Sequence, residues 1–230
     1  MTAATRHEIN YRRGMYAGAK PYRDCLVAAL QHFGLTSFTE QTEFWTLGGK
    51  EWYEYKFLKE QGLTFSKASY HNVDYGDIDP YNDQSVVIHK CNFFDIWQVW
   101  KRPTAICFDS TNGLVTSNEK VWLDLIQLGI AAAEITGKVS LNWNFLAGYG
   151  NRLGWRGPDD KVKGKSRQDV LFDRYERWLN AMKDHITIAG FRVDFFSYSV
   201  MAPKEKSRTP MISGHCLILY DTKHVRSRVC

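Results

Sequence analysis

Short apolar runs recur along the chain, and each ends in a polar or glycine-rich turn. They lie at residues 43–47, 85–89, 104–108 and 138–143. A short apolar run bounded by turn residues is typical of a buried β-strand. We therefore expect four strands here, and a further strand near residues 63–70.

Longer segments between these runs have the apolar spacing of helices. The pattern predicts a first helix over residues 21–33, ending at Gly34, and further helices over 51–61, 118–135 and 168–188. Apolar residues three and four apart form one face of each helix, and glycine is a common residue just past a helix end.

The alternation of strands and helices predicts a parallel α/β sheet. The last two predicted strands, at residues 191–200 and 212–220, have no helix between them, so we expect them to pair as an antiparallel hairpin. Parallel α/β sheets bind ligands outside the carboxyl ends of their strands. The turns that follow residues 47, 91 and 108 are therefore expected along one edge of the sheet.

The length of the chain, 230 residues, suits one domain. We expect an N-terminal helical extension over residues 1–38 and the α/β domain over residues 39–230. A stretch at about 147–167, rich in glycine and charge, predicts a mobile loop inside this domain.

Composition favours a globular protein of the cytoplasm. Hydrophobic residues make up 44% and charged residues 24% of the chain. No apolar run is long enough to span a membrane, and the N-terminal segment lacks the apolar core of a secretory signal, so we expect no membrane association. The five cysteines are scattered and no spacing suits a metal, so no metal site is expected.

A net charge of +5 is compatible with a polyanionic partner. Arg12, Arg13, Lys20 and Arg23 alternate with tyrosines near the N-terminus, and a second basic stretch lies at 161–167. Such segments either bind nucleic acid through phosphate contacts and base stacking or are ordinary solvated surface.

The order of the predicted elements over residues 40–221 resembles the class I S-adenosylmethionine-dependent methyltransferases. The resemblance implies a Rossmann-like, mostly parallel sheet with helices on both faces, closed by the antiparallel hairpin. It also implies S-adenosylmethionine as the cofactor. In that family a glycine-rich turn after the first strand cradles the methionine part, and groups after the second and third strands hold the ribose and adenine.

By this resemblance the cofactor turn is Leu47, Gly48, Gly49 and Lys50. The usual family pattern is an acidic residue followed by three alternating glycines, and this chain departs from it because its two glycines are adjacent. Glycine is needed in such a turn because the backbone must approach the cofactor closely.

Polar residues after the next two strands complete the implied cofactor site. Asp74 is the candidate for the ribose hydroxyls, with Asp77 and Asp79 as alternatives. Asn92 is the candidate for the adenine edge and Phe93 for its face, although Phe93 fits a core position equally well.

Asp109 and Asn112 follow the fourth predicted strand, where family members face the acceptor. An unpaired buried carboxylate is costly, so an acid at the end of a central strand suggests function. Asp109 is a candidate to contact the methionine amino group, to orient the acceptor or to act as a base. Asn112 is a candidate to hydrogen-bond the acceptor.

The sequence thus predicts a methyltransferase whose acceptor is a nucleic acid. A nicotinamide-dependent oxidoreductase is disfavoured because its third glycine is missing. A non-catalytic nucleic-acid-binding protein on a degenerate methyltransferase scaffold stays open, because the glycine-rich turn is imperfect.

Overall fold

The computed structural model describes residues 19–47, 52–74, 80–110, 118–146, 167–201 and 211–221. Predictions that fall elsewhere, including the loop at 147–166, lie outside the described residues. Seven strands form the main sheet: β2 (Glu43–Thr46), β4 (Tyr70–Val73), β5 (Val86–His89), β6 (Pro103–Ser110), β7 (Lys138–Leu146), β8 (Phe191–Met201) and β9 (Met211–Tyr220).

Within the described residues, four α-helices and one 3₁₀ helix accompany the sheet. They are α2 (Ala19–His32), α3 (Tyr53–Glu60), α4 (Asn118–Thr136), α5 (Arg167–Ile188) and the 3₁₀ helix η1 (Phe93–Gln98). Each α-helix matches a predicted one to within a few residues. Among the described helices, none combines the length and the hydropathy needed to span a membrane.

The strands lie in the order β5-β4-β2-β6-β7-β9-β8. Strands β5, β4, β2, β6 and β7 pair in parallel, and β9 runs antiparallel to both of its neighbours, β7 and β8. The predicted fold class is therefore confirmed: a mostly parallel, Rossmann-like sheet closed by an antiparallel pair.

The prediction for the second strand, residues 63–70, is wrong. Before residue 70, this range contains one strand, the two-residue β3 (Thr64–Phe65). It pairs with β1 (Ser37–Phe38) in a small separate sheet. Ala68 has a left-handed backbone with φ of 51°, which breaks the strand. The strand of the main sheet begins afterwards, at Tyr70, so Asp74 follows its end directly.

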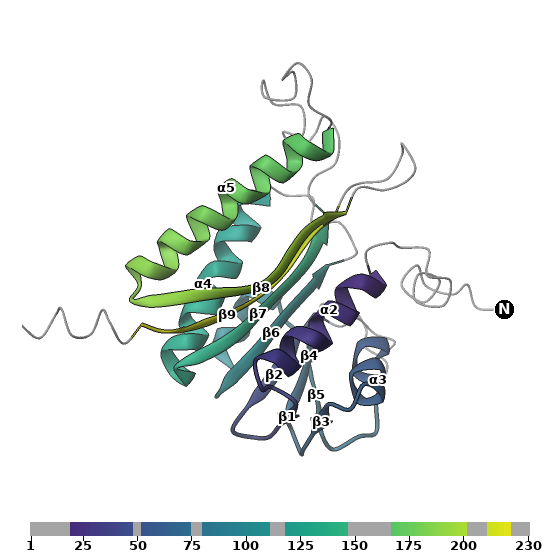
Figure 1. Cartoon of the computed structure of the whole chain (residues 1–230). Helices are drawn as coiled ribbons and strands as arrows, with labels where there is room; N and C mark the ends of the chain where they lie inside the picture. The colour runs from purple at the N-terminus through teal and green to yellow at the C-terminus, as the bar shows by residue number, and fades with distance from the viewer. Residues whose placement is uncertain are drawn as a thin grey trace, which may run out of the picture.

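Helices cover both faces of the main sheet (Figure 1), with α2 and α3 on one side and α4 and α5 on the other. The α2–α3 face buries a core that includes Leu26, Phe44, Tyr55 and Cys107. The opposite face buries a larger core around α4 and α5. Helix α2, which falls in the predicted N-terminal extension, packs against β7, β8 and β9 and so forms part of the layer over the sheet.

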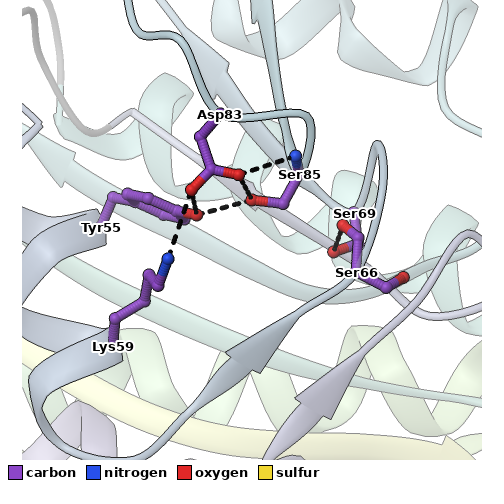
Figure 2. A network of polar contacts seen from close by, with 6 residues as sticks. All are labelled: Tyr55, Lys59, Ser66, Ser69, Asp83 and Ser85. Atoms are coloured by element: carbon purple, nitrogen blue, oxygen red, sulfur yellow. Dashed lines mark hydrogen bonds and ion pairs between the residues drawn. The ribbon is translucent and has the colours of Figure 1, made fainter.

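A polar network fastens α3 to the segment that leads into β5 (Figure 2). The Tyr55 hydroxyl donates to Asp83 Oδ2 at 2.7 Å and lies 2.6 Å from Ser85 Oγ. Lys59 Nζ is 3.3 Å from the same Asp83 oxygen. The Ser85 hydroxyl and backbone N–H both donate to Asp83 Oδ1. Burial raises the pKa of Asp83, but these hydrogen bonds together outweigh it and lower the pKa below its ordinary value, so the carboxylate stays charged at physiological pH.

The network predicts a measurable loss of stability in Tyr55→Phe. The ring stays in the core, but the hydroxyl contacts with Asp83 and Ser85 disappear, so we expect the free energy of unfolding to fall by about 1–2 kcal/mol. Urea denaturation measures this change. Tyr220→Phe, at a half-exposed ring, is the matched control and is expected to change little. Equal stability of the two variants would contradict a stabilising role for the network.

Candidate functional site

The sheet has a topological switch point between β2 and β6. The chain leaves β2 through α3 to reach β4 on one side, whereas β6 lies on the other side of β2. Ligands of open α/β sheets bind outside the carboxyl ends of the strands at such a point. Thr46 at the end of β2 pairs with Cys107, and β6 continues past it to Asp109 and Ser110.

Three predicted cofactor residues lie at this carboxyl edge. Leu47 follows β2, and its N–H donates to the carbonyl of Cys107 at 3.0 Å. Asp74 follows β4, and its N–H donates to the carbonyl of His89 at 3.1 Å. Asn92 begins η1, and its Oδ1 accepts from the N–H of Phe94 at 3.1 Å. The sheet therefore brings the ends of β2, β4 and β5 together as predicted, while the contacts of these residues with a cofactor stay a prediction.

Apart from Asp109, four of the other predicted site residues lie outside the described part of the chain, whereas Phe93 is described. Gly48, Gly49, Lys50 and Asn112 lie outside the described residues and stay predictions. Phe93 is only 4% exposed and packs against Phe108 in the core on the α4–α5 face, with ring centroids 5.2 Å apart. This placement favours the core interpretation of Phe93.

Asp109 is buried on the α2–α3 side of the sheet. Its Oδ1 accepts a hydrogen bond from Asn144 Nδ2 on β7 at 2.9 Å. Burial raises the pKa of Asp109, while the positive charge of Arg23 and the bond from Asn144 act against that rise. The carboxyl group therefore has one amide partner and one nearby cation.

Glu54 is a second buried acid at the same place, and the sequence analysis missed it. Its Oε1 accepts from Thr46 Oγ1 at 2.5 Å and from the Tyr70 hydroxyl at 3.3 Å. Burial, followed by the negative charge of Asp109, raises the pKa of Glu54 to about 7. Glu54 thus reaches from α3 to the end of β2.

One signal in the sequence points to Glu54. It lies four residues before Leu58 on the apolar stripe of the predicted 51–61 helix, where an acid is out of place.

The structure corrects the prediction for Arg23 as part of a nucleic-acid-binding surface. Arg23 is only 1% exposed, and its charge acts on both Asp109 and Glu54. The neighbouring Tyr22 is equally buried and stacks on His215 of β9, with ring centroids 5.0 Å apart. The assignment of Arg23 to the surface fails because Tyr22 and Arg23 lie on the buried face of α2.

We call Tyr22, Arg23, Glu54, Asp109 and Asn144 the buried polar cluster. Outside Arg23, three atoms of the cluster have no hydrogen-bond partner within the described part of the chain: the Tyr22 hydroxyl, Glu54 Oε2 and Asn144 Oδ1. Buried polar atoms are nearly always paired, because an unpaired one costs free energy. The cluster therefore offers free hydrogen-bonding groups beside the switch point.

Two imidazoles form a separate pair on the opposite face of the sheet. His71 Nδ1 lies 3.0 Å from His89 Nε2, and Trp45 stacks on His71 with ring centroids 4.1 Å apart. Burial lowers the pKa of His71 to about 3, so it is neutral at physiological pH. Among the described residues, no group of three or more His, Cys, Asp or Glu side chains is placed to hold a metal ion.

No protein-family model matches the chain, and no curated protein matches it significantly. Solved structures do share its fold. A Streptococcus thermophilus protein named "Putative hemolysin" aligns with a TM-score of 0.51 at 15% identity, over 86% of this chain and 66% of that one. The chain thus spans just under two thirds of that protein's length.

Two further structures come from methyltransferases. The 1,6-didemethyltoxoflavin-N1-methyltransferase of Burkholderia thailandensis, solved with S-adenosylhomocysteine, has a TM-score of 0.49 at 11% identity over 96% of this chain and 93% of that one. A SAM-dependent methyltransferase of Leishmania major has a TM-score of 0.41 at 12% identity over 90% and 76%. At such identities the likeness concerns the fold alone.

The raised pKa of Glu54 predicts a pH-dependent stability that Glu54→Gln removes. A carboxyl group with a pKa of about 7 in the folded state, against an ordinary 4.5, stabilises the fold fully below about pH 4.5 and loses that contribution as the pH rises through 7. A shift of this size corresponds to about 3 kcal/mol. Glutamine keeps the acceptor for Thr46 and does not ionise.

We therefore expect Glu54→Gln to match the parent protein near pH 5 and to exceed its stability at pH 8, as measured by urea denaturation. Glu60→Gln, at an exposed position of the same helix, is the matched control and should show no such divergence. A constant difference between Glu54→Gln and the parent across this range would argue against a protonated Glu54.

Proposed function

We propose that the chain is an S-adenosylmethionine-dependent methyltransferase. The observation that carries this proposal is the sheet order, with its antiparallel β9, combined with the buried acid Asp109 at the switch point between β2 and β6. This is the arrangement that the resemblance to class I methyltransferases implies.

Residues of the carboxyl edge fit the parts of that cofactor. Asp74, directly after β4, suits the ribose hydroxyls, and Asn92, after β5, suits the adenine edge. Asp109 suits the ammonium group of the methionine part. The free atoms of the buried polar cluster support the fit, because a polar ligand would pair groups that otherwise cost free energy.

The bound cofactor would supply the chemistry, an electrophilic methyl group on a sulfonium. The chain then has to bind, orient and exclude water, since in-line methyl transfer depends on positioning and a general base is optional. Asp109 suits this binding role better than that of a base, because it is buried, bonded to Asn144 and faced by Arg23.

For the acceptor, we keep a nucleic acid as the proposal. It is supported by the basic residues Arg12, Arg13 and Lys20 and by the stretch 161–167, without Arg23. Basic segments of this kind neutralise phosphates and make binding salt-dependent.

A non-catalytic nucleic-acid-binding protein on the same scaffold is the competing function. The adjacent glycines at 48 and 49, in place of the family's alternating ones, favour it. The two functions separate on cofactor binding, because the non-catalytic protein would bind nucleic acid but not the cofactor.

Calorimetric titration with S-adenosylmethionine tests the proposal, with NAD as the control ligand. We expect micromolar binding of the former alone. Asp109→Asn should weaken this binding about tenfold or more, because a hydrogen bond between charged groups is worth about 1.5–3 kcal/mol. Asp194→Asn, at an exposed position of β8, is the matched control.

The proposal is contradicted if the parent protein does not bind S-adenosylmethionine. Salt-sensitive binding of RNA or DNA would then support the non-catalytic nucleic-acid-binding protein. Binding that Asp109→Asn and Asp194→Asn leave equally strong would remove Asp109 from the site.

A further inference from the structure

Strand β8 forms one edge of the main sheet and has one side unpaired. It is 11 residues long, lies last in the strand order and pairs with β9, and within the described part of the chain no strand occupies its other side. The unpaired backbone groups of an edge strand are a template for pairing with a further strand. The opposite edge, β5, is only four residues long, which limits such pairing there.

The first part of the β8 edge is regular. Its register with β9 is continuous from Phe191 to Phe195 and shifts between Phe195 and Ser197, where a bulge lies. A bulge bends an edge strand and hinders pairing at that point. The part of the edge that is able to receive a strand is therefore residues 191–195.

Three residues of this segment direct their backbone groups to the unpaired side. The N–H of Asp221 on β9 donates to the carbonyl of Gly190 at 3.2 Å, so these two residues form a hydrogen-bonded pair. Hydrogen-bonded and non-hydrogen-bonded pairs alternate along an antiparallel ladder. Phe191, Val193 and Phe195 therefore belong to non-hydrogen-bonded pairs, and their N–H and C=O groups point away from β9.

The side chains of residues 191–195 form a pattern that is complementary to itself. An aliphatic residue stands at the centre, opposite charges stand on either side of it, and an aromatic ring stands at each end: Phe191, Arg192, Val193, Asp194 and Phe195. Arg192 and Asp194 are 54% and 51% exposed, with Nη2 and Oδ2 3.3 Å apart. A strand with this pattern matches a second copy of itself that runs in the opposite direction.

We propose that β8 is a dimerisation edge, which pairs antiparallel with β8 of a second copy of the chain, with Val193 at the two-fold axis. Val193 then lies opposite Val193, and Phe191 lies opposite Phe195. Since these are the residues whose backbone groups point outward, the contact forms about six backbone hydrogen bonds.

The charges select this register. With the axis at Val193, Arg192 of each copy lies opposite Asp194 of the other, so two attractive cross-strand pairs form. Moving the axis to Phe191 or to Phe195 loses both pairs, because Arg192 and Asp194 are then no longer opposite each other.

The inference does not depend on the proposed function. Strand β9 is antiparallel to both β7 and β8, so β8 runs in the direction of β7. Residues 191–195 therefore lie in the half of the sheet away from the carboxyl edge that holds the candidate site. Dimerisation is measured without a cofactor, so its failure leaves the proposed function untouched.

Sedimentation velocity over about 1–300 µM protein tests the proposal. We expect a monomer–dimer equilibrium with a dissociation constant on the order of 10–100 µM, because the contact is small. Arg192→Asp and Asp194→Arg should each raise that constant about tenfold or more, since each turns two attractive pairs into two repulsive ones. Glu60→Arg, at an exposed position of α3, is the control and should leave it unchanged.

Two rescue experiments separate the proposed pairing from a general effect of charge. A copy with Arg192→Asp has two acids on β8 and a copy with Asp194→Arg has two bases, so the mixed dimer regains two attractive pairs. We expect an equimolar mixture to associate at least as well as the parent. The double variant Arg192→Asp/Asp194→Arg exchanges the two charges and should also restore the dimer. Thermal unfolding verifies that each variant is folded.

Three results would overturn the inference. The first is a parent protein that stays monomeric up to about 300 µM, well above the expected dissociation constant. The second is a dimer that both single variants leave as stable as before, or that Glu60→Arg weakens equally, because the contact then lies elsewhere or responds to charge in general. The third is a mixture and a double variant that fail to recover the association lost in the single variants.

Discussion

Burial of two carboxyl groups at the switch point between β2 and β6 is the constraint on which the rest of the candidate site depends. Glu54 comes from α3 and Asp109 from β6, and both side chains are buried. Buried carboxyl groups need partners. Thr46, Asn144 and the guanidinium of Arg23 supply part of what they need.

The same constraint explains the place of α2 in the fold. This helix buries Tyr22 and Arg23 against the sheet, so it brings a cation to the two acids and stacks an aromatic ring on His215. A helix that covers the sheet and also brings a cation to its buried acids contributes to packing and to the candidate site together. Residues from α2, α3, β6 and β7 thus meet in one cluster although they are far apart in the sequence.

Much of the fold was predictable because apolar runs and helical spacing are local properties of the chain. A strand such as Pro103–Ser110 is recognisable in the sequence because it contains a continuous run of apolar residues. The strand Tyr70–Val73 does not, because its middle residues, His71 and Asn72, are polar yet buried, and their burial depends on the neighbours that the sheet provides. The apolar pattern therefore predicts the strand a few residues before its observed position.

The site was predictable only where its residues follow strands. The sequence places Asp74, Asn92 and Asp109 at one edge because the carboxyl ends of parallel strands meet there, and their roles stay predictions. Glu54 was missed because its contact with Thr46 depends on how α3 packs, and Arg23 was assigned to the surface because charge alone does not reveal which face of a helix is buried. Both errors concern side chains whose roles are set by tertiary packing.

The most direct test of the account is a crystal structure of the protein with S-adenosylhomocysteine. The account predicts that the ligand lies across the carboxyl ends of β2, β4, β5 and β6, with its amino nitrogen about 2.7–3.2 Å from a carboxylate oxygen of Asp109. A ligand bound elsewhere on the chain, or one whose amino-acid part points away from Asp109, would contradict it.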